Sequence, residues 1–170
     1  MIRICFHGAE STGKSVLAQL LSESLNCAWV PEFGRAYCEE RGTDLTMDDL
    51  LAIAQGQDAA MRAAAATDPA VLILDTDPLM TAAWAQMLFG TIPPELLGYA
   101  KAEQYFLFAA DVPWVADGTR FFGTDDARAR FAAIAQEVLV RAGVPVTRIA
   151  GDWRHREAQA RAAILAAMSP

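Results

Sequence analysis

The hydrophobic residues of this chain follow two alternating spacings, which predict strands and helices in turn. Short segments rich in apolar residues predict strands at 3–6, 28–30, 70–75, 105–109 and 144–149. The clearest, 70–75, is a continuous apolar run up to Asp75, typical of a parallel strand covered on both faces. Between them, apolar residues recur every three or four positions, as on one face of a helix. The expected helices cover 16–25, 34–40, 47–66, 79–89, 94–103, a stripe over 131–139 that Gly143 caps, and 152–168.

This alternation from one end of the chain to the other is the pattern of an α/β domain. A chain of 170 residues is long enough for one domain with a sizeable core, so we expect a single domain over 1–170. The expected fold is a five-stranded parallel sheet with helices on both faces. Right-handed crossovers bring the carboxyl ends of the strands to one edge, where ligands bind. The residues that follow each strand are therefore the candidates for chemistry.

Composition narrows the range of partners. The net charge of −7 argues against nucleic-acid binding, because a phosphate backbone requires clustered lysines and arginines. No apolar run approaches about 20 residues, and Met1 leads directly into the first strand, so neither a membrane span nor a signal peptide is expected. Cys5, Cys27 and Cys38 show no metal-like spacing, which favours reduced thiols and a cytoplasmic location.

The strongest motif follows the first strand and matches the pattern G-x-x-x-x-G-K-[ST] of a phosphate-binding loop. Its glycines allow the backbone N–H groups to converge on anionic oxygens, and the next helix adds the positive end of its dipole. The side chain of Lys14 is expected to reach the outer phosphates of ATP, and the Ser15 hydroxyl to bind Mg²⁺. The predicted nucleotide-binding residues are Gly8, Ala9, Glu10, Ser11, Thr12, Gly13, Lys14 and Ser15.

Three acidic residues follow predicted strands. Asp75 ends the clearest apolar run and is predicted to position Mg²⁺ together with Ser15, the alternative being a helix cap or turn residue. Glu32 is the first candidate for the carboxylate that accepts a proton from an acceptor hydroxyl, and Asp77 is the second. The alternatives are an exposed loop glutamate at 32 and, at 77, a residue that only begins the next helix.

The segment 111–128 lacks a regular hydrophobic period and is predicted to be a mobile lid. Guanidinium groups that close over a transferring phosphate stabilise its charge and exclude water, which points to Arg120 as catalytic and Arg128 as nucleotide-binding. Alternatively, these arginines pair with Asp125 or Asp126 on a surface loop.

Residues near the acidic strand ends are also candidates for binding the acceptor. Phe33 and Trp84 are the preferred aromatic residues for stacking on a heterocycle, although aromatic residues of an α/β domain usually belong to the core. Arg35 and Asp77 complete the predicted substrate-binding set. His7 ends a core strand, so a structural role is expected for it.

Five ordered segments resemble one family. The glutamate and serine inside the phosphate loop, the segment 32–35, the triplet 55–57, the Asp-Thr-Asp sequence at 75–77 and the segment 114–120 all match its motifs. The chain is similar over about 2–163 to the ribosylnicotinamide kinase domains of NadR-type NAD-salvage proteins and to their stand-alone relatives. Phe33 stands where that family has a tyrosine.

The resemblance implies a nucleoside/nucleotide-kinase-like fold that uses ATP and Mg²⁺. The implied activity is transfer of the γ-phosphoryl group to the 5′-hydroxyl of ribosylnicotinamide, giving nicotinamide mononucleotide. Two alternatives remain. One is a kinase for another nucleoside, deoxynucleoside or small alcohol, and the other is a regulatory phosphate-loop ATPase that acts through a protein partner.

Overall fold

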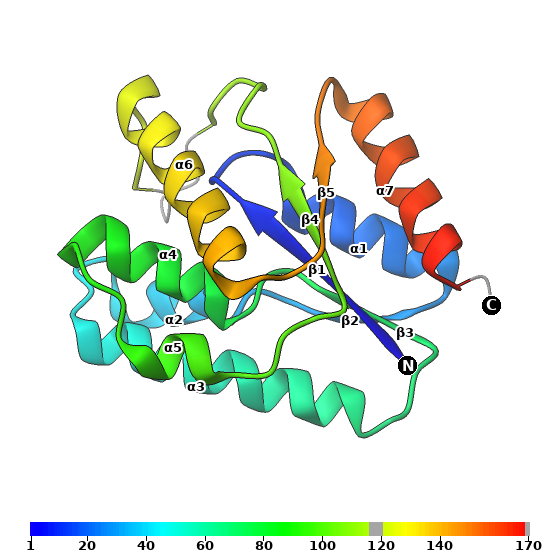
Figure 1. Ribbon diagram of the computed structural model, residues 1–170, viewed down its shortest axis with the longest axis horizontal. Coiled ribbons are helices and arrows are strands. Elements are labelled where there is room, and N and C mark those ends of the chain that lie inside the picture. Colours follow the sequence, from blue (N-terminus) through cyan, green and yellow to red (C-terminus); the bar gives the residue numbers. More distant parts are fainter. Residues whose placement is uncertain (116–120, 169–170) are drawn as a thin grey trace.

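The computed structural model describes residues 1–115 and 121–168 as a layered α/β domain (Figure 1). Its strands are β1 (Ile2–Gly8), β2 (Ala28–Val30), β3 (Val71–Leu74), β4 (Gln104–Phe108) and β5 (Val146–Ile149). Its helices are α1 (Lys14–Leu25), α2 (Phe33–Arg41), α3 (Met47–Ala65), α4 (Pro78–Phe89), α5 (Pro94–Gly98), α6 (Asp125–Ala142) and α7 (Trp153–Met168).

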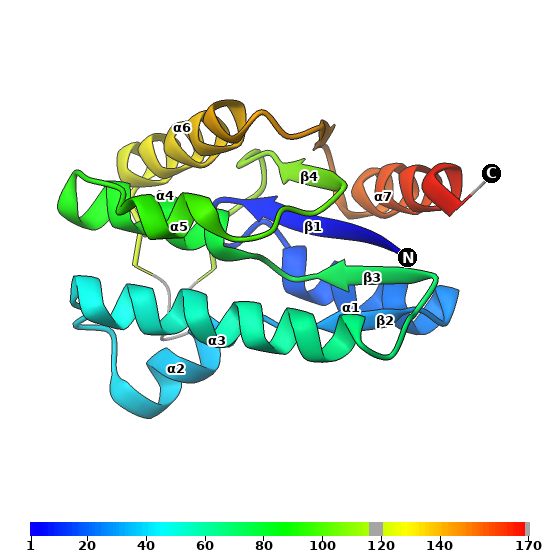
Figure 2. The same cartoon turned by 60° about the horizontal axis from the view of Figure 1, so that its bottom comes forward.

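The five strands form one parallel sheet in the order β2-β3-β1-β4-β5. Helices α1 and α7 lie on one face of this sheet, and α3, α4 and α6 lie on the other (Figure 2). Alternate side chains of β1 serve the two layers, since Ile4 and Phe6 pack with α1 and α7 while Cys5 packs with the opposite layer. This arrangement confirms the predicted fold class.

Local sequence explains most helix boundaries. Helix α3 begins with a capping box, in which the Thr46 hydroxyl accepts from the Asp49 N–H and the Asp49 carboxylate accepts from the Thr46 N–H. Helices α4 and α6 end at Gly90 and Gly143, both in the left-handed conformation. One expectation was wrong: the helix predicted over 94–103 ends at Gly98, because the backbone of Tyr99 is extended.

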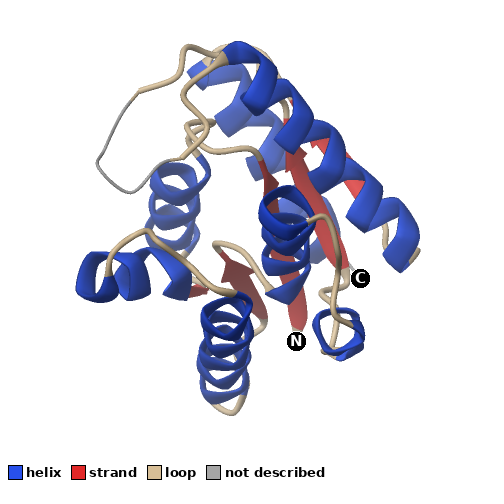
Figure 3. Ribbon diagram, turned by 90° about the vertical axis from the view of Figure 1, so that its left-hand side faces the viewer, coloured by secondary structure: helices blue, strands red, loops and turns tan. Residues whose placement is uncertain are grey.

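The sheet order places the carboxyl end of β1 at the centre of the functional edge. Strands β3 and β4 flank β1, and β2 lies beside β3, so the loops after these strands open toward the same end of the domain (Figure 3). Across the described residues, no helix combines the length and the apolar character that a membrane span requires. All three cysteines are unpaired, in agreement with the expectation of free thiols.

His7 occupies the end of β1, just before the phosphate loop, and is completely buried. Its Nε2 atom is 3.1 Å from the Ala135 carbonyl oxygen. Burial lowers the pKa of His7 to about 3, with a small additional effect of the positive charge on Lys14. The imidazole is therefore neutral in the folded protein at any pH near neutrality, as a structural role requires.

This burial makes the stability of the domain sensitive to acid. An unfolded histidine takes up a proton near pH 6.5, whereas folded His7 does so only near 3, so the free energy of unfolding falls as pH drops between these values. In the wild type, this effect should lower the free energy of unfolding by about 2 kcal/mol between pH 7 and pH 5. We expect His7→Gln to lack this decrease, measured by urea denaturation at both pH values. The matched control is His155→Gln at the second histidine, whose side chain is exposed. An unchanged slope in His7→Gln would contradict this explanation.

Candidate active site

The phosphate loop joins β1 to α1 in a conformation that its glycines make possible. Gly8 and Gly13 have φ angles of 127° and 84°, in the region that favours glycine. A Cβ atom on Gly8 would lie 2.6 Å from the Phe108 carbonyl oxygen, so strand β4 leaves no room for a side chain there. The loop can therefore curl tightly at the amino end of α1, as an anion-binding nest requires.

Two side chains of the loop fold back onto it. The Lys14 ammonium group donates to the Ala9 carbonyl oxygen at 2.7 Å, and the Thr12 hydroxyl donates to the same oxygen at 2.9 Å. Lys14 is half-buried and faces the cavity described next, so its ammonium group already lies within the loop. The positive charge is thus placed where phosphate oxygens would enter.

A cavity of about 310 Å³ opens beside the loop and collects most of the predicted site residues. Those that line it are Gly8, Glu10, Ser11, Thr12, Gly13, Lys14, Ser15, Glu32, Arg35 and Trp84. The remaining described members of the prediction, which do not line it, are Ala9, Phe33, Asp75, Asp77 and Arg128. Arg120 lies outside the described residues. The sheet edge therefore brings together groups from the phosphate loop, α2 and α4, far apart in sequence.

Asp75 lies behind the phosphate loop and has the features of a metal-positioning carboxylate. The residue is 2% exposed, and its Oδ1 atom has no hydrogen-bond partner among the residues described. Burial raises the pKa of Asp75 to about 7, the negative charge of Glu32 adds to this effect, and a hydrogen bond with Ser15 opposes it. A buried carboxylate oxygen without a partner beside a serine hydroxyl fits Mg²⁺, so the predicted pair of ligands remains our proposal.

Asp77 has a different environment from Asp75. Its Oδ1 atom accepts from the Leu79 N–H at 3.0 Å and caps α4, and its Oδ2 atom accepts from the Tyr105 hydroxyl. The residue is 1% exposed and does not line the cavity. This geometry favours a structural role for Asp77, as the residue that begins α4. It gives less support to the predicted roles of second candidate base and substrate ligand.

Helix α2 presents charged residues to the cavity and turns its aromatic residues away. Glu32 is the N-cap residue of α2, and Glu32 and Arg35 both line the cavity. Phe33 is 37% exposed and does not line the cavity. Its ring packs closely against Gly56 of α3, since a Cβ atom added to Gly56 would lie only 2.4 Å from the ring. The predicted stacking of a substrate on Phe33 therefore gains no support from this geometry.

Gln57 on α3 is a site residue whose role the sequence pattern did not reveal. Its Oε1 atom accepts from the Phe33 N–H at 2.7 Å, and its Nε2 atom donates to the carbonyl oxygens of Pro31 and Thr76 at 3.3 and 3.4 Å. The side chain is 1% exposed and joins the segments that follow β2 and β3. Its only signal in the sequence was membership of the triplet 55–57.

The described ends of the predicted lid are tied to the phosphate loop. The Ser11 hydroxyl accepts from the Val115 N–H at 2.7 Å, and the Glu10 carboxylate accepts from the N–H groups of Phe121 and Phe122 at 3.0–3.2 Å. Helix α6 begins at Asp125, so the last four residues of the predicted lid belong to this helix. The residues between 116 and 120 lie outside the description.

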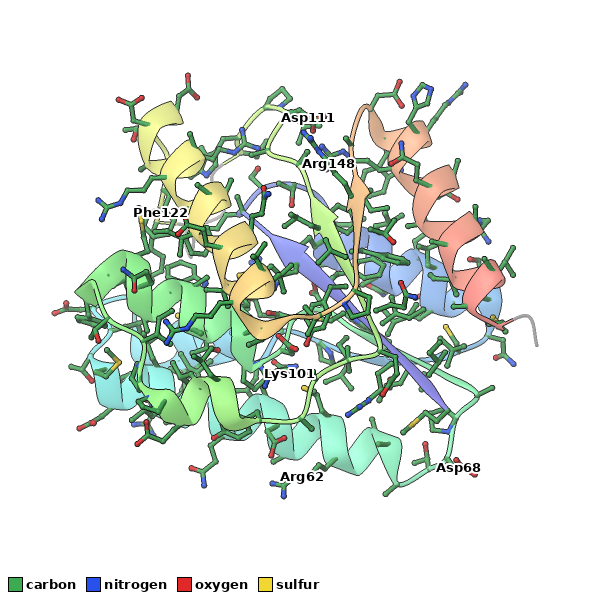
Figure 4. All side chains as sticks on the ribbon, in the orientation of Figure 1. Arg62, Asp68, Lys101, Asp111, Phe122 and Arg148 are labelled. Carbon is green, nitrogen blue, oxygen red and sulfur yellow. The ribbon has the colours of Figure 1, made fainter. Side chains whose placement is uncertain are left out.

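An aromatic cluster forms one wall of the cavity. The ring of Trp84 on α4 lies 4.9–5.1 Å from the rings of Phe121, Phe122 and Phe131. Figure 4 shows Phe122 between α4 and α6 at the functional edge. Trp84, Phe121 and Phe131 line the cavity, and the predicted stacking of Trp84 on a substrate remains our proposal.

Arg128 projects from the first turns of α6 toward the phosphate loop. One of its terminal nitrogens donates to the Ser11 carbonyl oxygen at 3.4 Å, and its Nε atom has no hydrogen-bond partner in 1–115 or 121–168. The residue is only 7% exposed. A buried guanidinium with spare donors beside the loop supports the proposal that it binds the nucleotide.

Arg156 on α7 braces the loop from the opposite side, and the sequence pattern gave no signal for it. The side chain is 1% exposed. Its guanidinium donates to the carbonyl oxygens of Gly151, Thr12 and Ala109 at 2.7–3.0 Å and pairs with Asp111. Asp111 lies beyond the end of β4 (Figure 4). One side chain thus joins the phosphate loop to the ends of two strands.

We expect Arg156→Lys to weaken nucleotide binding, because an ammonium group cannot satisfy the same set of carbonyl oxygens. Buried acceptors left without a donor should cost about 1–3 kcal/mol of stability and raise the Kd for Mg·AMP-PNP at least about tenfold. Isothermal titration calorimetry and thermal unfolding measure the two effects. Arg161→Lys, at a half-buried arginine of the same helix that donates to Ser24 and Glu157 rather than to the phosphate loop, is the matched control. An unchanged Kd in Arg156→Lys would show that the brace does not shape the loop.

Comparison with known proteins places these features in context. Residues 3–156 match the model of the AAA domain family. The chain is 30% identical over 149 residues to the trifunctional NAD biosynthesis/regulator protein NadR of Escherichia coli (strain K12), a match that covers 84% of this chain and 36% of NadR. The chain thus spans about a third of the length of this curated relative.

Solved structures share the fold at low sequence identity. NadR in complex with NR superimposes with a TM-score of 0.76 and 20% identity, over 95% of this chain and 50% of that one. NadR in complex with NAD and AMP-PNP superimposes with a TM-score of 0.76 and 19% identity, over 99% of this chain and 50% of that one. A thymidylate kinase from Ehrlichia chaffeensis superimposes with a TM-score of 0.69 and 12% identity, over 99% of this chain and 98% of that one.

These matches confirm two expectations from the sequence, the resemblance to NadR-type domains and the nucleoside/nucleotide-kinase-like fold. The family model covers most of the chain, including the phosphate loop and the cavity. The protein therefore belongs to the AAA domain family, is similar to NadR over most of this chain, and has a nucleoside/nucleotide-kinase-like fold.

Proposed function

We propose that this protein is an ATP- and Mg²⁺-dependent kinase that phosphorylates the 5′-hydroxyl of a nucleoside. The observation that carries this proposal is a single cavity lined both by the phosphate loop and by a carboxylate residue, Glu32. A phosphate donor and an alcohol acceptor bound in this cavity would be held next to each other. Positioning of this kind, with electrostatic stabilisation, supplies most of the catalysis in phosphoryl transfer.

The residues divide the work as follows. Backbone N–H groups of the loop bind the triphosphate, while Lys14 and Arg128 offset charge on the phosphoryl oxygens. Ser15 and Asp75 hold Mg²⁺, which supplies further positive charge to the phosphate oxygens. Glu32 accepts a hydrogen bond from the acceptor hydroxyl and orients it for in-line attack. It takes the hydroxyl proton as the new O–P bond forms, while the bond between the γ-phosphorus and the bridging oxygen breaks and ADP leaves. Arg120 is the remaining candidate for a side chain that stabilises the charge on the transferring phosphoryl group.

We further propose ribosylnicotinamide as the acceptor and nicotinamide mononucleotide as the product. Support comes from the five motifs shared with NadR-type domains and from the structure of NadR in complex with NR. The aromatic side chains around Trp84 suit stacking against the flat ring of a nucleoside base. The negative charge of Glu32, which lines the same cavity, suits a ring that carries a positive charge, as nicotinamide does in ribosylnicotinamide. The analogue AMP-PNP in a NadR structure supports ATP as the donor.

A panel experiment tests this function. Purified protein is incubated with Mg·ATP and separate nucleosides, including ribosylnicotinamide, thymidine and deoxyadenosine, and phosphorylated products are detected by mass spectrometry. We expect the highest kcat/KM for ribosylnicotinamide. A preference for another nucleoside would keep the kinase and replace the acceptor. ADP release without any phosphorylated acceptor would favour the regulatory ATPase instead.

A further inference from the structure

Thr76, between the two acidic residues that follow β3, has an unusual backbone. Its φ angle is 119°, in a region that β-branched residues rarely adopt because Cβ clashes with the backbone. Such strain persists in a folded protein only where the surrounding structure enforces it, and it is concentrated at functional sites. The conformation of Thr76 therefore needs a physical explanation.

Hydrogen bonds on both sides of Thr76 enforce this conformation. The preceding residue, Asp75, donates its N–H to the Val30 carbonyl oxygen at 2.9 Å, and the following residue, Asp77, caps α4. The carbonyl oxygen of Thr76 itself accepts from Gln57 Nε2 at 3.4 Å. The chain is thus fixed before, at and after this residue.

Thr76 lies in the wall of the cavity, and its hydroxyl has no hydrogen-bond partner among the described residues. Thr76 is 6% exposed and lines the cavity that also contains Glu32 and Gln57. Its Oγ1 atom is buried and has no hydrogen-bond partner within the described part of the chain. Buried hydroxyl groups are nearly always hydrogen-bonded, so an unpartnered one on the wall of a binding cavity is poised for a ligand.

We propose that the Thr76 hydroxyl binds the acceptor by hydrogen-bonding to one of its hydroxyl groups. This inference rests on the proposed function and adds a residue to it, because Thr76 was not among the predicted site residues. The ligand class is a polyhydroxylated molecule such as a ribonucleoside, whose hydroxyl groups both donate and accept. The hydrogen bond from Gln57 and the cap at Asp77 hold the strained backbone of Thr76 in place beside the cavity.

The test compares steady-state kinetics of the wild type with Thr76→Val and Thr76→Ser, using ribosylnicotinamide and Mg·ATP. Valine keeps the shape and β-branching of threonine but lacks the hydroxyl, whereas serine keeps the hydroxyl. We expect Thr76→Val to raise the KM for the nucleoside about tenfold and Thr76→Ser to stay within about twofold of the wild type. The Kd for Mg·AMP-PNP should remain within about twofold in both variants.

Two further variants separate binding from folding. Thr76→Gly removes the hydroxyl and relieves the positive φ, so it should show the raised KM with a Tm no lower than that of the wild type. Thr67→Val, after the end of α3, is the matched control and should leave the KM unchanged.

The outcomes distinguish this inference from the proposed function. If the wild type phosphorylates ribosylnicotinamide and Thr76→Val has an unchanged nucleoside KM, the role of Thr76 is refuted and the function stands. If Thr76→Val weakens nucleoside and nucleotide equally, the hydroxyl acts on the general shape of the site and the inference also fails. If the wild type phosphorylates no nucleoside, the proposed function fails and the inference fails with it.

Discussion

Lys14→Ala should abolish phosphoryl transfer while the protein remains folded. The ammonium group of Lys14 lies within the phosphate loop, 2.7 Å from the Ala9 carbonyl oxygen, where the outer phosphates would bind. Its removal takes away a full positive charge that stabilises the transferring group, so we expect kcat/KM to fall by about 10³-fold. Tm should stay within about 3 °C of the wild type, because the side chain is not part of the core. A coupled ADP-release assay and differential scanning calorimetry measure both quantities.

The chain offers one matched control, because its only other lysine is Lys101. Lys101 lies before β4, at the end of the sheet away from the loop, and donates to the carbonyl oxygens of Leu97 and Tyr99 (Figure 4). Lys101→Ala should leave kcat/KM within about twofold, whatever it does to stability. Normal turnover in folded Lys14→Ala would exclude the proposed nucleotide site.

Glu32→Gln should produce the second large loss, in kcat rather than in nucleotide affinity. A glutamine keeps the shape of Glu32 at the cavity wall but cannot take the proton of the acceptor hydroxyl. We expect kcat to fall by about 10²–10⁴-fold, with the Kd for Mg·AMP-PNP within about threefold of the wild type. Glu40→Gln, on the exposed surface of the same helix, is the matched control.

Asp77→Asn tests the other candidate base in parallel. An asparagine has only one acceptor oxygen, so either the cap of α4 or the hydrogen bond from Tyr105 is lost. The expected cost is about 1–3 kcal/mol of stability, seen as a lower Tm, with kcat of the folded fraction within about tenfold. If instead Asp77→Asn lost kcat at unchanged Tm while Glu32→Gln remained active, the two assignments would be exchanged.

The course of β1 and the phosphate loop was predictable because the information is local. A short apolar run, two glycines at fixed spacing and a lysine beside Ser15 specify a strand, a tight turn and a helix start without contacts from elsewhere. The same holds for the cap of α3 at Thr46, which involves residues three positions apart. These features remain recognisable whatever the rest of the chain does.

The assignment of the acidic residues was only partly predictable. Glu32, Asp75 and Asp77 all follow strands, and the sequence ranks Glu32 before Asp77 as the base and assigns Asp75 to the metal without revealing what surrounds them. Their environments differ because of neighbours from distant segments, since Asp77 accepts a hydrogen bond from Tyr105 whereas one oxygen of Asp75 has no described partner. Pairings across 28 residues leave no periodic signal in the chain.

Gln57 and Arg156 show the limit of sequence reasoning most clearly. Arg156 donates to the carbonyl oxygen of Thr12, 144 residues away, and Gln57 joins backbone groups that follow two different strands. Each looks like an ordinary polar residue on a helix. Only the packing of that helix against the sheet turns it into a brace for the site.

The sequence by itself determined the parallel α/β class, the phosphate loop and the edge of the sheet at which the candidate site lies, because these depend on short-range spacing. The tertiary structure decided which carboxylates line the cavity, where α6 begins within the predicted lid, and how Thr76 is held with a hydroxyl that has no partner among the described residues. Those features depend on contacts between segments far apart in the chain. Such contacts exist only after the helices have packed on both faces of the sheet.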